Sequence, residues 1–118
     1  MSEDLNKSNI LSSVYQVIQK RLEEKPENSY VVSLAEKGLE KILSKISEES
    51  AEVIMAGIES KDDSEKSLDH LNYEICDLFF HTLVLAAYKN ISFESIEKEM
   101  ARRFGTSGLK EKKSRKSN

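Results

Sequence analysis

Apolar residues recur every three or four positions over most of the chain, the spacing that places them on one face of an α-helix. The first such segment begins near Ser8 or Asn9, both good helix-capping residues, and ends near Glu24. Pro26 stops it, because proline disfavours the helical conformation of the residue that precedes it. Beyond the proline, the pattern predicts an extended connector over Tyr30–Ser33 and a short helical piece over Leu34–Gly38.

Stronger helical patterns follow. They predict helices over Leu39–Glu59 and Leu68–Lys89, separated by a polar loop at Ser60–Ser67, and a last helix capped by Ser92. Four amphipathic helices joined by short loops indicate an all-α fold, arranged as an antiparallel four-helix bundle. The third helix is apolar on nearly every side, which is typical of a buried helix. Because one small bundle cannot bury so much apolar surface, we expect homo-oligomerisation to complete it.

Acidic residues interrupt the apolar faces of the two longest predicted helices. On the first of them, Glu49 lies in the middle of the apolar stripe and Glu52 follows one turn later. On the second, Glu74 and Asp77 repeat the same i, i+3 spacing, which places both side chains on one face. Burying an unpaired charge costs roughly several kcal/mol. We therefore infer that the four carboxylates converge and that a cation neutralises them.

A ligand set made of carboxylates predicts a hard divalent ion. Oxygen ligands suit Mg²⁺, with Mn²⁺ as a substitute, and Mg²⁺ held by carboxylates shares its other positions with substrate phosphates. A di-iron centre of the Glu-x-x-His type is disfavoured, because neither histidine stands at that spacing from an acidic ligand. His81 instead fits a buried histidine bonded to a carboxylate, a role in which it would support Asp77. The pattern favours phosphoanhydride chemistry.

Charged residues beside the four carboxylates are candidates for catalysis and phosphate binding. Glu48 and Glu49 are the candidate catalytic residues. Because Glu48 lies off the apolar stripe, its role stays open between a general base, a ligand of a second metal ion and a surface residue. Lys41 and Lys45 precede the carboxylates by one or two turns and could bind phosphate oxygens. On spacing alone, a solvated salt-bridge face is the simpler explanation for the two lysines.

Composition restricts the domain organisation and the partners. The 118 residues predict one helical domain over 8–109, with a flexible N-terminus at 1–7 and a disordered basic tail at 110–118. A net charge of −3 gives no electrostatic basis for binding nucleic acid. No apolar run approaches the roughly 20 residues that span a bilayer, and the first residues lack the apolar core of a signal peptide. With Cys76 as the single cysteine, we expect a cytoplasmic protein without membrane partners.

Motifs over nearly the whole chain, from about Leu11 to Arg115, resemble one group of helical enzymes. The pattern Glu49-x-x-Glu52, a gap of 21 residues and Glu74-x-x-Asp77 is similar to that of the nucleotide pyrophosphohydrolases related to MazG and the dimeric dUTPases. The string Arg102-Arg-Phe-Gly-Thr-Ser-Gly108 is more specific. It resembles the corresponding string of the phosphoribosyl-ATP pyrophosphatases, which act in histidine biosynthesis.

This resemblance implies a MazG-like bundle that hydrolyses phosphoribosyl-ATP to phosphoribosyl-AMP and pyrophosphate, with Mg²⁺ and as a homodimer or larger homo-oligomer. It also implies that Arg102 and Arg103, with backbone amides from Gly105 onwards, bind the ribose phosphate or the triphosphate. A structural alternative for the same string is a helix end at which Gly105 adopts a left-handed conformation. Cys76 and Phe80 depart from the residues expected of the family, without touching the predicted ligands.

Two other functions stay open at the level of sequence. A related enzyme that removes non-standard or excess dNTPs would share the acidic residues and would release pyrophosphate from a different substrate. A non-enzymatic helical interaction module would neither bind Mg²⁺ nor be stabilised by it. Comparing pyrophosphate release from phosphoribosyl-ATP and from dNTPs separates the phosphoribosyl-ATP enzyme from the dNTP enzyme. The response to Mg²⁺ tests the interaction module.

Overall fold

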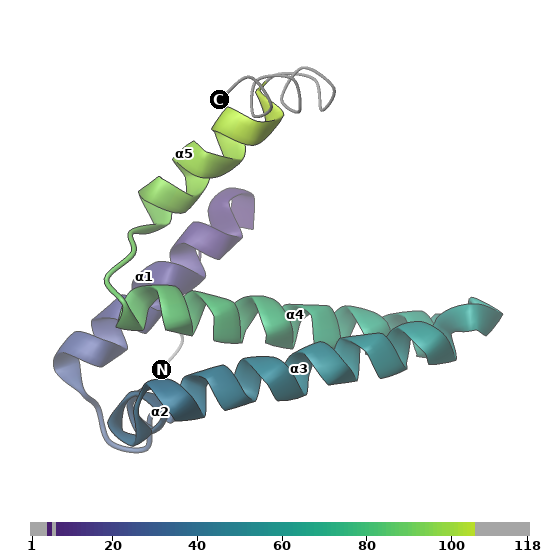
Figure 1. Cartoon of the computed structure of the whole chain (residues 1–118), viewed down its shortest axis with the longest axis horizontal. Coiled ribbons are helices and arrows are strands. Elements are labelled where there is room, and N and C mark those ends of the chain that lie inside the picture. The colour runs from purple at the N-terminus through teal and green to yellow at the C-terminus, as the bar shows by residue number, and fades with distance from the viewer. Residues whose placement is uncertain (1–4, 6, 106–118) are drawn as a thin grey trace.

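The computed structural model describes Leu5 and residues 7–105. Of the predicted flexible N-terminus at 1–7, residues 1–4 and 6 fall outside the described part, and the predicted basic tail at 110–118 falls wholly outside it. The described part of the chain is helical and contains no strand (Figure 1), which confirms the all-α fold. Its α-helices are α1 (Ile10–Glu24), α2 (Tyr30–Lys37), α3 (Leu39–Glu59), α4 (Glu65–Tyr88) and α5 (Phe93–Phe104), with short 3-10 helices η1 (Lys7–Asn9) and η2 (Ser60–Asp62).

Serine side chains cap the start of three helices. Ser29, Ser64 and Ser92 each accept a hydrogen bond from the backbone N–H three residues further on, at 3.3, 3.2 and 3.1 Å. Such caps satisfy a donor that the first helical turn leaves without a partner. The predicted extended connector over Tyr30–Ser33 is therefore wrong, because Ser29 starts helix α2 directly before it. Ser64 likewise starts α4 at Glu65, earlier than the apolar periodicity predicted.

Helices α3 and α4 form a long antiparallel hairpin, the most extensive helix pair of the described chain (Figure 1). Helix α1 packs on α4, while α2 packs on both α1 and α3. Helix α5 leaves the end of α4 and points away from the hairpin. The core lies where α1 and α2 meet the hairpin, and its most deeply buried side chains are Ile18, Leu34, Ile42, Val31 and Val84.

The single chain is an open structure. Its radius of gyration is 17.0 Å, whereas a compact domain of 100 residues has about 13 Å. Large apolar side chains stay exposed on several helices, among them Phe79 at 51%, Met100 at 56% and Phe104 at 75% of their full exposure. Within the described residues, none of the helices combines the length and the apolar character needed to span a bilayer.

Candidate metal centre

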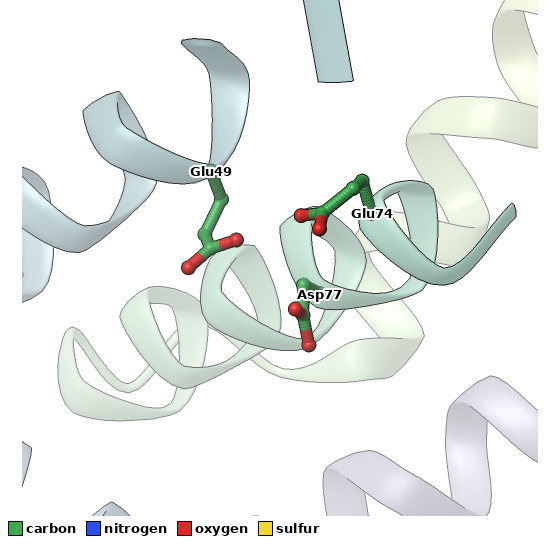
Figure 2. A group of neighbouring side chains, drawn as sticks. All are labelled: Glu49, Glu74 and Asp77. Carbon is green, nitrogen blue, oxygen red and sulfur yellow. The ribbon is translucent and has the colours of Figure 1, made fainter. Parts of the chain in front are cut away.

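Three carboxylates meet on the hairpin. Glu49 projects from α3 and faces α4, where Glu74 and Asp77 lie about one turn apart (Figure 2). Ligand oxygens of the three residues all lie within 4.8 Å of one another. Glu49 and Glu74 are only 8% and 7% exposed, and Asp77 is partly buried. The hairpin thus places acidic groups where the apolar pattern alone would place core residues.

Glu52 lies outside this group, although the sequence suggested that four carboxylates converge. It is exposed on α3, one turn beyond Glu49. The negative charge of Glu52 nevertheless affects the group electrostatically. The pKa of Glu74 is raised mainly by burial and then by repulsion from Glu52, Asp77 and Glu49. His70 opposes this rise from 3.9 Å, on an exposed part of α4. Glu52 therefore influences the three clustered carboxylates through its charge but does not belong to the cluster.

The spacing of the carboxylates fits a small divalent ion. Mg²⁺–oxygen bonds measure about 2.0–2.1 Å, so oxygens on opposite sides of the ion lie about 4.2 Å apart. The observed limit of 4.8 Å exceeds that span by a margin that small side-chain rotations close. The donor set contains oxygen alone, which Mg²⁺ and Mn²⁺ prefer. The three residues therefore fit the group that the sequence implied.

Lys45 lies at the edge of the acidic group and connects it to Glu48. Its ammonium is 3.0 Å from a carboxylate oxygen of Glu48 and 3.6 Å from one of Glu49. The hydrogen bond to Glu48 raises the pKa of Lys45 and lowers the pKa of Glu48, which is itself exposed. Lys41, one turn earlier, also helps to lower the pKa of Glu48. Of the two predicted phosphate-binding lysines, Lys45 thus lies beside the acidic group, and Lys41 lies one turn before Lys45 on α3.

His81 is buried behind Asp77 with both ring nitrogens engaged. Its Nδ1 is 2.8 Å from the backbone carbonyl oxygen of Asp77, and its Nε2 is 2.8 Å from the hydroxyl oxygen of Tyr30. The sequence-based interpretation, a histidine bonded to a carboxylate, is therefore wrong in its partner: His81 contacts the main chain of Asp77. Tyr30 was predicted only as part of an extended connector, with no role in the site. The serine at position 29, a helix cap, is the signal that would have placed Tyr30 on a helix beside the site.

Arg102 and Arg103 are not brought to the acidic group. They occupy the last turn of α5, which points away from the hairpin (Figure 1), and both bind Glu99 at 2.7 and 2.8 Å. These two arginines lower the pKa of Glu99 to about 2. The predicted left-handed conformation of Gly105 is wrong, because its φ is −73°. Glycine is required there for space, since an added Cβ would lie 2.5 Å from the carbonyl oxygen of Ala101.

Comparison with known proteins shows the family of this chain. The family described as phosphoribosyl-ATP pyrophosphohydrolase matches residues 11–104. A phosphoribosyl-ATP pyrophosphatase of Vesicomyosocius okutanii subsp. Calyptogena okutanii is 54% identical over 90% of this chain and 95% of its own length. One from Geobacter metallireducens is 47% identical over 92% and 94%, and one from Clostridium acetobutylicum is 50% identical over 84% and 84%. Because the match covers nearly all of the helical part, including the three clustered carboxylates, the chain belongs to the phosphoribosyl-ATP pyrophosphohydrolase family.

Proposed function

We propose that this protein hydrolyses phosphoribosyl-ATP to phosphoribosyl-AMP and pyrophosphate, the second step of histidine biosynthesis. The observation that carries the proposal is the group of Glu49, Glu74 and Asp77 on a helix hairpin in a chain of this family, with Glu49 and Glu74 buried and Asp77 partly buried. Carboxylates that are buried or partly buried within 4.8 Å of one another repel, so their position has a physical explanation when a cation binds between them.

We propose Mg²⁺ as that cation, with Mn²⁺ as a substitute, held by Glu49, Glu74 and Asp77. When bound, such an ion neutralises charge on substrate phosphates and makes a bound water more acidic. Glu52 would contribute negative charge from the rim of the site, through its effect on Glu74. The raised pKa of Glu74 is consistent with a group whose charge is incompletely neutralised by protein residues alone.

Lys45 and Glu48 are proposed to act together during hydrolysis. Water attacks a phosphorus of the phosphoanhydride, the bond to the bridging oxygen breaks, pyrophosphate leaves, and a carboxylate takes the proton of the water. While Lys45 holds Glu48 at 3.0 Å, the lowered pKa makes Glu48 a weak base. A phosphate that draws Lys45 away would restore the basicity of Glu48. Lys41 lies one turn away and would add a second positive charge for the phosphates.

We further propose that a second copy of the chain completes the molecule. An apolar groove of about 720 Å³ runs between α1, α4 and α5, lined by residues that include Leu78, Phe79, Leu83, Phe93 and Met100. Apolar surface of this kind marks an interaction site. If Arg102 and Arg103 bind substrate, they must do so at the acidic group of another subunit, because they lie away from the one on their own hairpin. A homo-oligomer would bring such a second site to them. Sedimentation or light scattering should show a homodimer or larger assembly.

The compartment proposed is the cytoplasm. The substrate is a nucleotide, and the single cysteine, Cys76, is exposed as a free thiol, which suits a reducing environment. No nucleic-acid or membrane partner forms part of the proposal.

Pyrophosphate release tests the proposed function. The protein is incubated with Mg²⁺ and either phosphoribosyl-ATP or a panel of dNTPs, and Glu49→Gln serves as the matched variant without a full ligand set. We expect release from phosphoribosyl-ATP that depends on Mg²⁺ and is lost in the variant. Preferred release from dNTPs would favour a nucleotide house-cleaning enzyme, and no release from any substrate would favour an interaction module.

A further inference from the structure

The aromatic ring of Tyr30 is held in place by contacts with two residues of α4. Tyr30 is the first residue of α2, and its hydroxyl oxygen lies 2.8 Å from Nε2 of His81. The Tyr30 ring meets the His81 ring edge to face with centroids 5.6 Å apart, and it stacks on the ring of Phe80 with centroids 6.3 Å apart. Phe80 also packs edge to face on His81. The three rings together determine the orientation of the tyrosine.

His81 also places this ring close to the acidic group. Its Nδ1 lies 2.8 Å from the backbone carbonyl oxygen of Asp77, one of the three clustered residues. Because a carbonyl oxygen can only accept, Nδ1 donates its hydrogen to Asp77, and in the neutral imidazole Nε2 accepts from the hydroxyl of Tyr30. One imidazole ring therefore separates the tyrosine hydroxyl from the main chain of Asp77. In a nucleotide, one ribose separates the first phosphate from the base, which is a comparable span.

Tyr30 keeps a large open surface and lines a cleft. It is 47% exposed, whereas His81, to which its hydroxyl is bonded, is 5% exposed. The cleft lies between the end of α1 and the start of α2 and has a volume of about 510 Å³, within the range of about 300–1,000 Å³ that small-molecule sites occupy. Its charged lining residues, two basic and two acidic, are Lys20, Arg21, Glu24 and Glu27. Because these charges balance, the cleft suits the base of a nucleotide better than its phosphates.

We propose that the fixed ring of Tyr30 is the stacking surface for the purine base of the substrate, and that the cleft beside it holds this base while the phosphates lie at the acidic group. The inference rests on the proposed hydrolysis of phosphoribosyl-ATP and adds a contact to the part of the substrate that does not react. Aromatic side chains and bases attract each other through their flat faces. Because His81 and Phe80 already fix the ring, little conformational entropy is lost when the base binds.

Inhibition by the two proposed products tests the stacking contact, because phosphoribosyl-AMP contains the base and pyrophosphate does not. Tyr30→Leu removes the aromatic ring, and the matched control Tyr30→Phe removes only the hydroxyl. In Tyr30→Leu, inhibition by phosphoribosyl-AMP should weaken at least about fivefold, as expected when one base–aromatic stack is lost, and inhibition by pyrophosphate should change less than about twofold. Tyr30→Phe should stay within about twofold of the wild type for both products, because the stack remains. Equal weakening for both products, or in both variants, would overturn the proposal.

Steady-state kinetics separate base binding from support of the acidic group. A stack on the base lies away from the reacting phosphorus, so it contributes equally to the ground state and the transition state. We therefore expect Tyr30→Leu to raise KM for phosphoribosyl-ATP at least about fivefold and to change kcat by less than about twofold. An unchanged KM would contradict the proposal, whatever happens to kcat. The wild type is measured alongside, so failure of the proposed function is recognised separately as the absence of hydrolysis by the unaltered protein.

Proton NMR of the unaltered protein provides a test that needs no turnover. The chain has four tyrosines, and comparison with Tyr30→Phe identifies the ring resonances of Tyr30. At saturating phosphoribosyl-AMP, we expect nuclear Overhauser effects between the ring protons of Tyr30 and protons H2 or H8 of the purine base. Contacts of the base with a different tyrosine, or none with Tyr30 at saturation, would refute the stacking contact. This spectrum decides the proposal even if Tyr30→Leu fails to fold.

Discussion

Removing one charge from the acidic group should stabilise the protein without metal and destabilise it with metal. The variant Asp77→Asn keeps the shape of the side chain and removes its charge. Oxygens of Asp77 and Glu49 lie within 4.8 Å of each other. At that distance two like charges repel by about 0.9 kcal/mol with the dielectric constant of water and about 3.5 kcal/mol with an effective value of 20. Since Asp77 is partly exposed and salt screens it, we take about 1 kcal/mol as the gain in the free energy of unfolding.

Thermal unfolding followed by circular dichroism measures this effect. In EDTA, Asp77→Asn should melt roughly 4 °C or more above the wild type, since 1 kcal/mol corresponds to about 4–8 °C in a domain of up to 100 residues. Mg²⁺ at ten to a hundred times its dissociation constant should stabilise the wild type by about 1 to 3 kcal/mol and the variant by much less. At Mg²⁺ of about a hundred times the dissociation constant, where the wild type gains about 3 kcal/mol, the order of the two melting temperatures should therefore reverse relative to EDTA.

The matched control is Asp69→Asn, which removes the same charge from an exposed position on the same helix, outside the acidic group. All melts use one protein concentration, because an oligomer unfolds at a concentration-dependent temperature. The control should follow the wild type in both buffers. Our account of the carboxylate group would be refuted if Asp77→Asn melted at or below the wild type in EDTA and still gained the full stabilisation from Mg²⁺.

Four further outcomes are expected. Glu49→Gln should lower turnover by at least roughly a hundredfold in steady-state kinetics, as loss of a charge at a metal site does, and near-normal turnover would contradict this. Because the pKa of Glu74 is raised, protons should compete with Mn²⁺ for this carboxylate at a higher pH than for an ordinary one. Titration calorimetry should therefore show the affinity for Mn²⁺ falling as the pH is lowered, and an affinity independent of pH would contradict this. Glu99 has a depressed pKa of about 2 against an ordinary 4.5, so the stability that its ionised form contributes is present above about pH 4.5 and is lost as the pH falls through 2. The difference in melting temperature between wild type and Glu99→Gln should shrink over that interval, and a constant difference would contradict the ion pairs of Glu99 with Arg102 and Arg103. Ser92→Ala should cost about 1 kcal/mol in denaturant unfolding, because α5 loses its cap, whereas an unchanged midpoint would show that the cap is dispensable.

Helices and their order follow from the sequence because their causes are local. Apolar spacing predicted α1, α3 and α4, and the serine at position 92 marked the start of α5. Helix α2 was predicted only in part. Its first turn, Tyr30–Ser33, contains adjacent valines that also suit an extended strand, and the choice depends on the cap at Ser29 and on burial of Val31 against neighbouring helices. Local propensity does not contain that second contribution.

Three of the four predicted carboxylates of the candidate site cluster in the structure, whereas the surroundings of the cluster were not predictable from the sequence. Charges at Glu49, Glu74 and Asp77 conflict with an apolar face, and that conflict is visible in the sequence. Helical spacing cannot show that Glu52, one turn along the same helix, falls outside the group, because this depends on how α3 rotates against α4. The contact between Tyr30 and His81 joins residues 51 positions apart, so no local pattern reports it.

The most direct test of the account is where a divalent ion binds. Crystals grown with Mn²⁺, measured near the manganese absorption edge, would locate the ion by its anomalous scattering. We predict a peak between Glu49, Glu74 and Asp77, with carboxylate oxygens from both α3 and α4 about 2 Å from it. Manganese bound elsewhere on the chain, or no peak between these helices at saturating Mn²⁺, would contradict the claim that this hairpin is built around a metal ion.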